Sequence, residues 1–112
     1  MAELLISPAA NDDLIAIREY ITKDLDSPKA AANTLNKIIK SIKRLIDFPL
    51  SGAPLESIID FPNDYRFVVS GNYISFYRYA DGTVFVDRVL YGGRDFVKIL
   101  FGDLPEPSTD NN

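Results

Sequence analysis

Hydrophobic residues recur at intervals of three and four over the first half of the chain, and at intervals of two over much of the second half. A change of period of this kind predicts helices followed by strands. The short apolar run from Leu4 to Ile6 predicts a first strand, and Ser7-Pro8 then combines a helix N-cap with a first-turn proline. An amphipathic helix is predicted over residues 8–24, with one buried stripe formed by Leu14, Ile17, Ile21 and Leu25.

A second Ser-Pro pair, Ser27-Pro28, predicts the start of another helix, and Pro49 marks its end. Its apolar stripe comprises Ala31, Leu35, Ile38, Ile39, Ile42, Leu45 and Ile46. Basic side chains lie mostly on the other side, at Lys37, Lys40, Lys43 and Arg44. Because so few residues join the two helices, they must fold back on each other as a hairpin.

The second half predicts a three-strand antiparallel meander over residues 65–69, 73–79 and 83–91, which are rich in Val, Ile, Phe and Tyr. Residues 94–101 have the length and apolar spacing of a short closing helix, and residues 103–112 predict a disordered acidic tail. Residues 1–102 are therefore predicted to form one α+β domain. Its N-terminal strand is followed by a two-helix hairpin that packs on a mainly antiparallel sheet of about four strands.

The chain of 112 residues contains no cysteine, histidine or tryptophan. The lack of cysteine excludes disulfides and thiolate metal sites, and the lack of histidine excludes the usual catalytic triads and zinc protease motifs. We therefore expect no metal and no cofactor. A reducing cytoplasm is the default location, since no apolar run approaches the roughly 18 residues that a membrane span needs.

The formal charge is −4, yet residues 64–102 hold five basic and four acidic side chains. This segment interleaves basic and aromatic residues: Arg66, Tyr73, Tyr77, Arg78, Tyr79, Arg88, Tyr91, Arg94 and Asp95. Such a pattern can hold phosphates and stack bases, although arginine and tyrosine more often only solvate a sheet. Solvated surfaces also best explain the basic ridge on the second helix and the scattered helix carboxylates Asp12, Asp13, Glu19 and Asp24.

The order of strand, helix hairpin, Phe48-Pro49 loop and meander resembles the RelE/ParE superfamily of toxins from bacterial type II toxin–antitoxin modules. The resemblance runs from about residue 3 to residue 101, and its most specific segments are Tyr65-Arg66, Gly71-Asn72-Tyr73, Phe76-Tyr77-Arg78 and residues 88–95. It implies a small toxin that is neutralised by an antitoxin, whose extended C-terminal segment wraps around the helix hairpin and the sheet.

The RelE branch of this superfamily consists of ribosome-dependent messenger-RNA endonucleases. Their basic cluster would fall at about positions 66, 68, 74 and 94 of this chain, with a tyrosine near position 100. Arg66 and Arg94 fit that pattern, whereas Val68, Ile74 and Leu100 do not. Two arginines alone supply no evident acid or base for phosphodiester cleavage.

The ParE branch lacks that cluster, ends its sheet with a segment like residues 88–95, and poisons DNA gyrase; this chain resembles it more closely. The resemblance then implies no catalytic residue, and the lack of a membrane-length apolar run predicts no membrane partner. It implies a gyrase-binding surface that includes Arg88, Tyr91, Arg94 and Phe96. There are two alternatives. One is a RelE-like endoribonuclease that uses Arg66 and Arg94 against ribosome-bound mRNA, and the other is a non-toxic module that only binds an antitoxin.

The antitoxin, in a hetero-oligomer with the toxin, is expected to cover the groove between the helix hairpin and the sheet. The expected contacts are Leu14, Ile17, Ile21, Leu35, Ile38 and Ile42, which supply more apolar surface than a small sheet is expected to cover. The first strand is also expected to lie at a sheet edge, where a partner strand can add.

Overall fold

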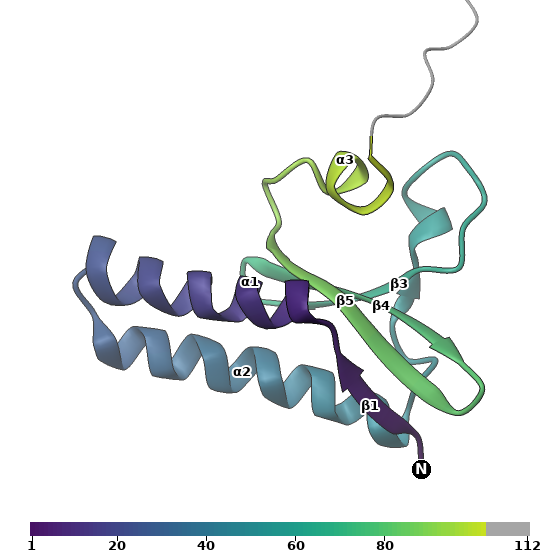
Figure 1. Ribbon diagram of the computed structural model, residues 1–112, viewed down its shortest axis with the longest axis horizontal. Helices are drawn as coiled ribbons and strands as arrows, with labels where there is room; N and C mark the ends of the chain where they lie inside the picture. Colours follow the sequence, from purple (N-terminus) through teal and green to yellow (C-terminus); the bar gives the residue numbers. More distant parts are fainter. Residues whose placement is uncertain (103–112) are drawn as a thin grey trace, which may run out of the picture.

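The computed structural model describes residues 1–102, and the predicted tail and its boundary with the domain lie outside the described residues. Strand β1 (Glu3–Ile6) leads into helix α1 (Pro8–Glu19), which continues as a π-helical turn η1 (Tyr20–Asp24). Helix α2 (Pro28–Asp47) returns antiparallel to α1 and completes the hairpin seen in Figure 1. The predicted α+β fold is confirmed.

Both helices begin as the Ser-Pro pairs predict. The hydroxyl oxygen of Ser7 accepts a 2.9 Å hydrogen bond from the amide of Ala10, and that of Ser27 accepts one of 3.2 Å from Ala30. The π-helical turn was not predicted, and Leu25 comes after it. Leu25 is 57% exposed rather than buried, because the chain leaves the helical path before this side chain can face the core.

The sheet has five strands, in the order β1-β5-β4-β3-β2, so the predicted number of about four is one too low. Strands β3 (Arg66–Ser70), β4 (Tyr73–Ala80) and β5 (Thr83–Tyr91) form the predicted meander. β1 pairs in parallel with β5 and lies at one edge, as expected. The additional strand is β2 (Ala53–Pro54), which lies at the other edge and pairs with β3 over only two residues.

Each face of the sheet covers its own core. On one face, Tyr77, Val84, Val86 and Val89 pack against the helix hairpin. On the other face, a smaller cluster centred on Leu55, Phe76 and Leu90 packs under the short helix α3 (Phe96–Phe101) and the 3₁₀ turn η2 (Leu55–Ser57). Figure 1 shows α3 and the hairpin on separate sides of the meander. The neighbours Phe76 and Tyr77 therefore both lie in cores, 1% and 0% exposed.

A β-bulge interrupts the pairing of β4 with β5. Phe76 pairs with Arg88 while Tyr77 pairs with Val86, which leaves Asp87 as the extra residue. One carboxylate oxygen of Asp87 accepts hydrogen bonds from the hydroxyl of Tyr65 (2.8 Å) and from Nε of Arg78 (3.0 Å). The backbone carbonyl of Asp87 also accepts a 2.7 Å hydrogen bond from the hydroxyl of Ser7. The bulge thus joins the sheet to the start of α1.

Candidate functional site

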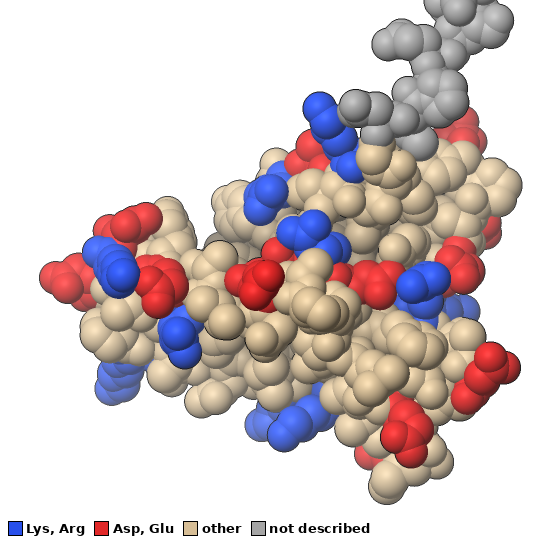
Figure 2. All heavy atoms as spheres, in the orientation of Figure 1, with Lys and Arg blue, Asp and Glu red and all other residues tan. Residues whose placement is uncertain are grey.

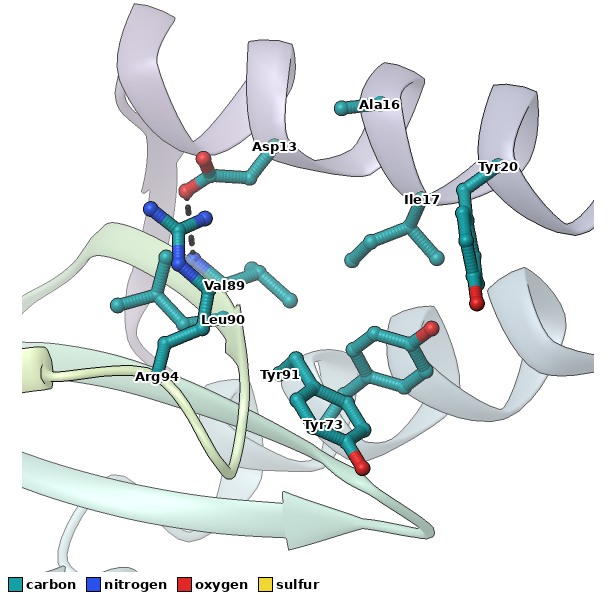
Figure 3. A pocket seen from close by; sticks show the side chains of 9 residues that line it. All are labelled: Asp13, Ala16, Ile17, Tyr20, Tyr73, Val89, Leu90, Tyr91 and Arg94. Atoms are coloured by element: carbon teal, nitrogen blue, oxygen red, sulfur yellow. Dashed lines mark hydrogen bonds between the residues drawn. The ribbon is translucent and has the colours of Figure 1, made fainter. Parts of the chain in front are cut away.

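A groove of about 500 Å³ lies between α1 and the ends of β4 and β5 (Figure 3). Its helical side is formed by Asp13, Ala16 and Ile17 of α1, together with Tyr20 at the start of η1. Its sheet side is formed by Tyr73 of β4, by Val89, Leu90 and Tyr91 of β5, and by Arg94 in the turn that follows. The floor of the groove is apolar, and its rim carries phenol rings and one arginine.

Three tyrosines converge on the rim, and strand register brings two of them together. Tyr73 pairs with Tyr91 across β4 and β5, and their ring centroids lie 6.0 Å apart in an edge-to-face arrangement. Tyr20 faces them from the helix, as Figure 3 shows. Burial raises the pKa of Tyr73, and the neighbouring hydroxyls of Tyr20 and Tyr91 raise it further. Tyr73 is therefore a neutral hydrogen-bonding group at physiological pH.

Asp13 fixes the helix to the sheet at one end of the groove. Its two carboxylate oxygens each accept a 2.7 Å hydrogen bond from the guanidinium of Arg88, and one of them also accepts a 2.9 Å bond from the amide of Val89. The bonds to Asp13 raise the pKa of Arg88 despite partial burial. Arg88, one of the residues predicted to bind the target, is therefore held in an ion pair within the molecule.

Arg94 is the cation that the groove presents to solvent. Its backbone amide donates a 3.0 Å hydrogen bond to the carbonyl of Tyr91, which closes the turn after β5. The Tyr91 ring lies against Gly93, where a Cβ would come within 2.8 Å of it, so a side chain at this position would displace the ring. Tyr91 is 53% exposed, and the Arg94 side chain makes no ion pair with any residue from 1 to 102.

Phe96 lies apart from this groove. Its ring is half-buried against Phe76, with ring centroids 5.2 Å apart, in the core beneath α3. Of the four residues predicted to bind the target, the structure thus brings Tyr91 and Arg94 together on one open surface. It places Arg88 in an internal ion pair and Phe96 in a core.

The structure does not bring Arg66 and Arg94 together. Arg66 begins β3, whose other end, Ser70, pairs with Tyr73 near Arg94. Four residues of strand separate the two ends by about 13 Å. The guanidinium of Arg66 instead donates to the carbonyls of Gly52 (2.6 Å) and Leu50 (3.2 Å). Arg66 therefore fastens the loop after α2 and does not share a phosphate-sized site with Arg94.

The residues expected to contact an antitoxin belong mainly to the first core. Leu14, Ile17, Ile21, Ile38 and Ile42 are buried, and Leu35 is half-buried against them. The expectation that they supply more apolar surface than the sheet covers is wrong, because the hairpin and the sheet already bury them against each other. A partner must use other side chains of the hairpin and sheet, or reach these through an opening of the core.

Sequence reasoning missed Asp13 and Asp87, the two carboxylates that organise the interior. It placed Asp13 on a solvated helix surface, whereas this side chain is 11% exposed. The described residues contain no group of three or more carboxylates placed to hold a metal ion. No helix within residues 1–102 is both long enough and apolar enough to cross a membrane.

Comparison with known proteins points to one family. Residues 4–96 match the family described as "ParE toxin of type II toxin-antitoxin system, parDE". No curated protein sequence matches the chain. Among solved structures, a chain of the "Chromosomal ParDE TA system from P. aeruginosa" is similar, with a TM-score of 0.68 and 20% sequence identity. The match covers 81% of this chain and 96% of that one, and at this identity it shows the fold alone.

Proposed function

Since the chain belongs to the family of ParE toxins of type II toxin–antitoxin systems, we propose that it stops growth by poisoning DNA gyrase in the cytoplasm. Poisoning here means that gyrase-cleaved DNA accumulates and replication stops. An antitoxin keeps the toxin inactive until the antitoxin is removed. In this proposal the toxin acts through a binding surface and not through an active site.

The different environments of the arginines in the second half support this proposal. Arg66 bonds to loop carbonyls, Arg78 to Asp87 and Arg88 to Asp13. The side chain of Arg94, alone among these four, makes no hydrogen bond or ion pair with another residue in the described part of the chain, and it lies on the rim of the tyrosine groove. One exposed cation beside phenols forms a recognition surface, whereas cleavage of RNA needs several charged groups around one phosphate.

The test of the target is a pair of parallel assays after induction of the toxin. We expect linear DNA to accumulate when purified gyrase, supercoiled plasmid and toxin are combined with ATP, and we expect intact messenger RNA on translating ribosomes. Ribosome-dependent cuts in messenger RNA without gyrase-linked DNA breaks would instead assign the RelE-like activity. If growth does not stop, and neither cleaved DNA nor cleaved messenger RNA is found, the chain is a module that only binds an antitoxin.

The antitoxin is tested separately from the target. A short reading frame beside this gene should encode a protein with a DNA-binding N-terminus and an amphipathic C-terminus. We expect the two proteins to co-purify after co-expression, and the complex to be inactive in the gyrase assay. A neighbouring product that neither binds the toxin nor relieves growth arrest would contradict this part of the proposal.

A further inference from the structure

The tyrosine groove, between α1 and the ends of β4 and β5, has the size of a site for a small molecule. Its volume of about 500 Å³ lies within the range of about 300–1,000 Å³ that such sites occupy. Figure 3 shows Asp13 and Arg94 toward one end of the groove and Tyr20 toward the other. A ligand in this groove therefore meets charged groups at one end and an aromatic ring at the other, over an apolar floor.

The charge that the groove offers to a ligand is positive. Asp13 and Arg94 are its charged lining residues. Both carboxylate oxygens of Asp13 already accept hydrogen bonds from Arg88, and one of them also accepts the amide of Val89. The side chain of Arg94 makes no ion pair with any residue from 1 to 102. A guanidinium of this kind binds phosphate through two parallel hydrogen bonds, so the groove favours an anion.

The aromatic end of the groove is built where α1 becomes irregular. Tyr20 is the first residue of the π-helical turn η1, and π-helical turns are rare and frequently lie at functional sites. The side chains of Tyr20 and Tyr91 are 50% and 53% exposed. These phenol rings leave apolar surface open to solvent, which the planar ring of a ligand can cover by stacking.

We propose that the tyrosine groove binds a nucleoside monophosphate, with its base stacked on the rings of Tyr20 and Tyr91 and its phosphate bonded to Arg94. The edge of a base carries hydrogen-bond donors and acceptors, and a phenol hydroxyl can pair with either. A single phosphate matches the single arginine that lines the groove. The inference goes beyond the proposed function, because it concerns a ligand of the toxin alone.

A free nucleotide fits this groove better than a nucleic acid strand does. A strand presents a phosphate at every nucleotide, and its binding depends on several cations along its path. The groove is lined by one arginine and no lysine, and the net charge of −4 repels a polyanion. On the face shown in Figure 2, basic side chains lie scattered among acidic and uncharged ones and form no continuous strip.

Titration of the full-length chain, followed by nuclear magnetic resonance, tests the phosphate end. Adenosine 5′-monophosphate (AMP) should bind with a Kd on the order of 0.1 mM. Arg94→Ala should weaken AMP binding about tenfold, and adenosine should bind the unmodified protein about tenfold more weakly than AMP. Adenosine binding should not change in Arg94→Ala, because this ligand lacks the phosphate that Arg94 contacts. Lys29→Ala, an exposed cation outside the groove, should bind AMP like the unmodified protein.

Substitution of Tyr20 tests the aromatic end. Tyr20→Leu should weaken binding of AMP and of adenosine by the same factor, about tenfold, because both ligands carry the base. Tyr20→Phe should retain most of the affinity, since stacking needs the ring and not the hydroxyl. Tyr79→Leu is the control, because Tyr79 does not line the groove and should not affect binding. Circular dichroism of each variant establishes that the fold is retained.

Three results would overturn the inference. The first is no binding of AMP up to about 10 mM, or equal losses in the groove and control variants. The second is binding of ribose 5-phosphate as tight as that of AMP, which would show a site for an anion without a base. The third is a single-stranded oligonucleotide that binds far more tightly than AMP and depends on Arg94, which would replace the free nucleotide with nucleic acid. None of these titrations contains gyrase or antitoxin, so their failure leaves the proposed function standing.

Discussion

The backbone amide of Gly52 donates a 3.0 Å hydrogen bond to the hydroxyl of Tyr77, whose side chain lies in the centre of the first core. The same hydroxyl donates a 2.7 Å bond to the carbonyl of Pro49. Burial raises the pKa of Tyr77, although the Gly52 bond acts in the opposite direction. One phenol from β4 thus closes the loop after α2. This loop leads into β2 and lines the groove between α2 and β3.

Gly52→Ala should strongly destabilise the protein. A Cβ at this position would lie 2.5 Å from the Tyr77 hydroxyl and 2.8 Å from the carbonyl of Phe67. Since Tyr77 is fixed in the core and the carbonyl is backbone, neither can move away at low cost, and we expect a loss of about 2–3 kcal/mol in urea unfolding. Gly92→Ala is the control, because its Cβ would meet no atom closer than 3.4 Å. Equal stability of the two variants would contradict the close packing around Gly52.

The Asp13–Arg88 pair should stabilise the fold. Asp13→Ala leaves Arg88 and the amide of Val89 without their acceptor, so we expect a loss of about 2 kcal/mol in the free energy of unfolding. Arg88→Ala combined with Asp13→Ala should cost less than the sum of the two single changes, since both remove the same interaction. Asp12→Ala, one residue away and exposed, should change stability by less than about 0.5 kcal/mol.

Local sequence signals were sufficient for most of the fold. The Ser-Pro pairs set the starts of both helices, and the period-two segments with their short turns set the meander, because each signal depends on residues close together in the chain. β2 could not be predicted, because its formation depends on residues that are far apart in the chain. Two residues carry no periodicity, and their pairing depends on bonds that Arg66 and Tyr77 make with the preceding loop.

The candidate sites were harder to predict than the fold. An apolar stripe such as Ile38 and Ile42 shows which side of a helix is buried, but its spacing is the same whether the sheet or a partner covers it. Asp13 resembled any solvated helix carboxylate, since its partner Arg88 is 75 residues away along the chain. The resemblance to the RelE branch also placed Arg66 and Arg94 in one candidate cluster, although they lie near opposite ends of β3.

Tyr65 should make the protein sensitive to alkali. Burial, followed by the hydrogen bond to Asp87, raises the pKa of Tyr65 to about 12, above the usual value of about 10. The folded state thus holds this proton more tightly than the unfolded state, so the associated stability is complete below about pH 10 and is lost as the pH rises through about 12. Tyr65→Phe should lower stability by about 1 kcal/mol at neutral pH and flatten this alkaline decline.

Urea unfolding at a series of alkaline pH values measures the Tyr65 effect. Tyr73 and Tyr77 also have raised pKa values, so the variant should retain part of the wild-type decline. Tyr79→Phe serves as the comparison, because this side chain is 38% exposed. An unchanged pH profile in Tyr65→Phe would contradict the raised pKa of Tyr65 in the folded protein.

Substitutions of Arg94 and Arg66 should distinguish a residue on a contact surface from a residue that stabilises the fold. Arg94→Ala removes an exposed cation, so it should reduce gyrase-dependent DNA cleavage about tenfold or more while leaving the melting temperature within about 1 °C. Arg66→Ala removes the bonds to Gly52 and Leu50, so it should lower stability by about 1–2 kcal/mol and reduce activity only as far as the folded fraction falls. Lys29→Ala, an exposed cation that lines neither groove, should match the wild type in both assays. The reverse pattern, with folded Arg66→Ala and Arg94→Ala each abolishing ribosome-dependent mRNA cleavage, would replace gyrase with messenger RNA as the target, since both arginines would then act on one phosphate.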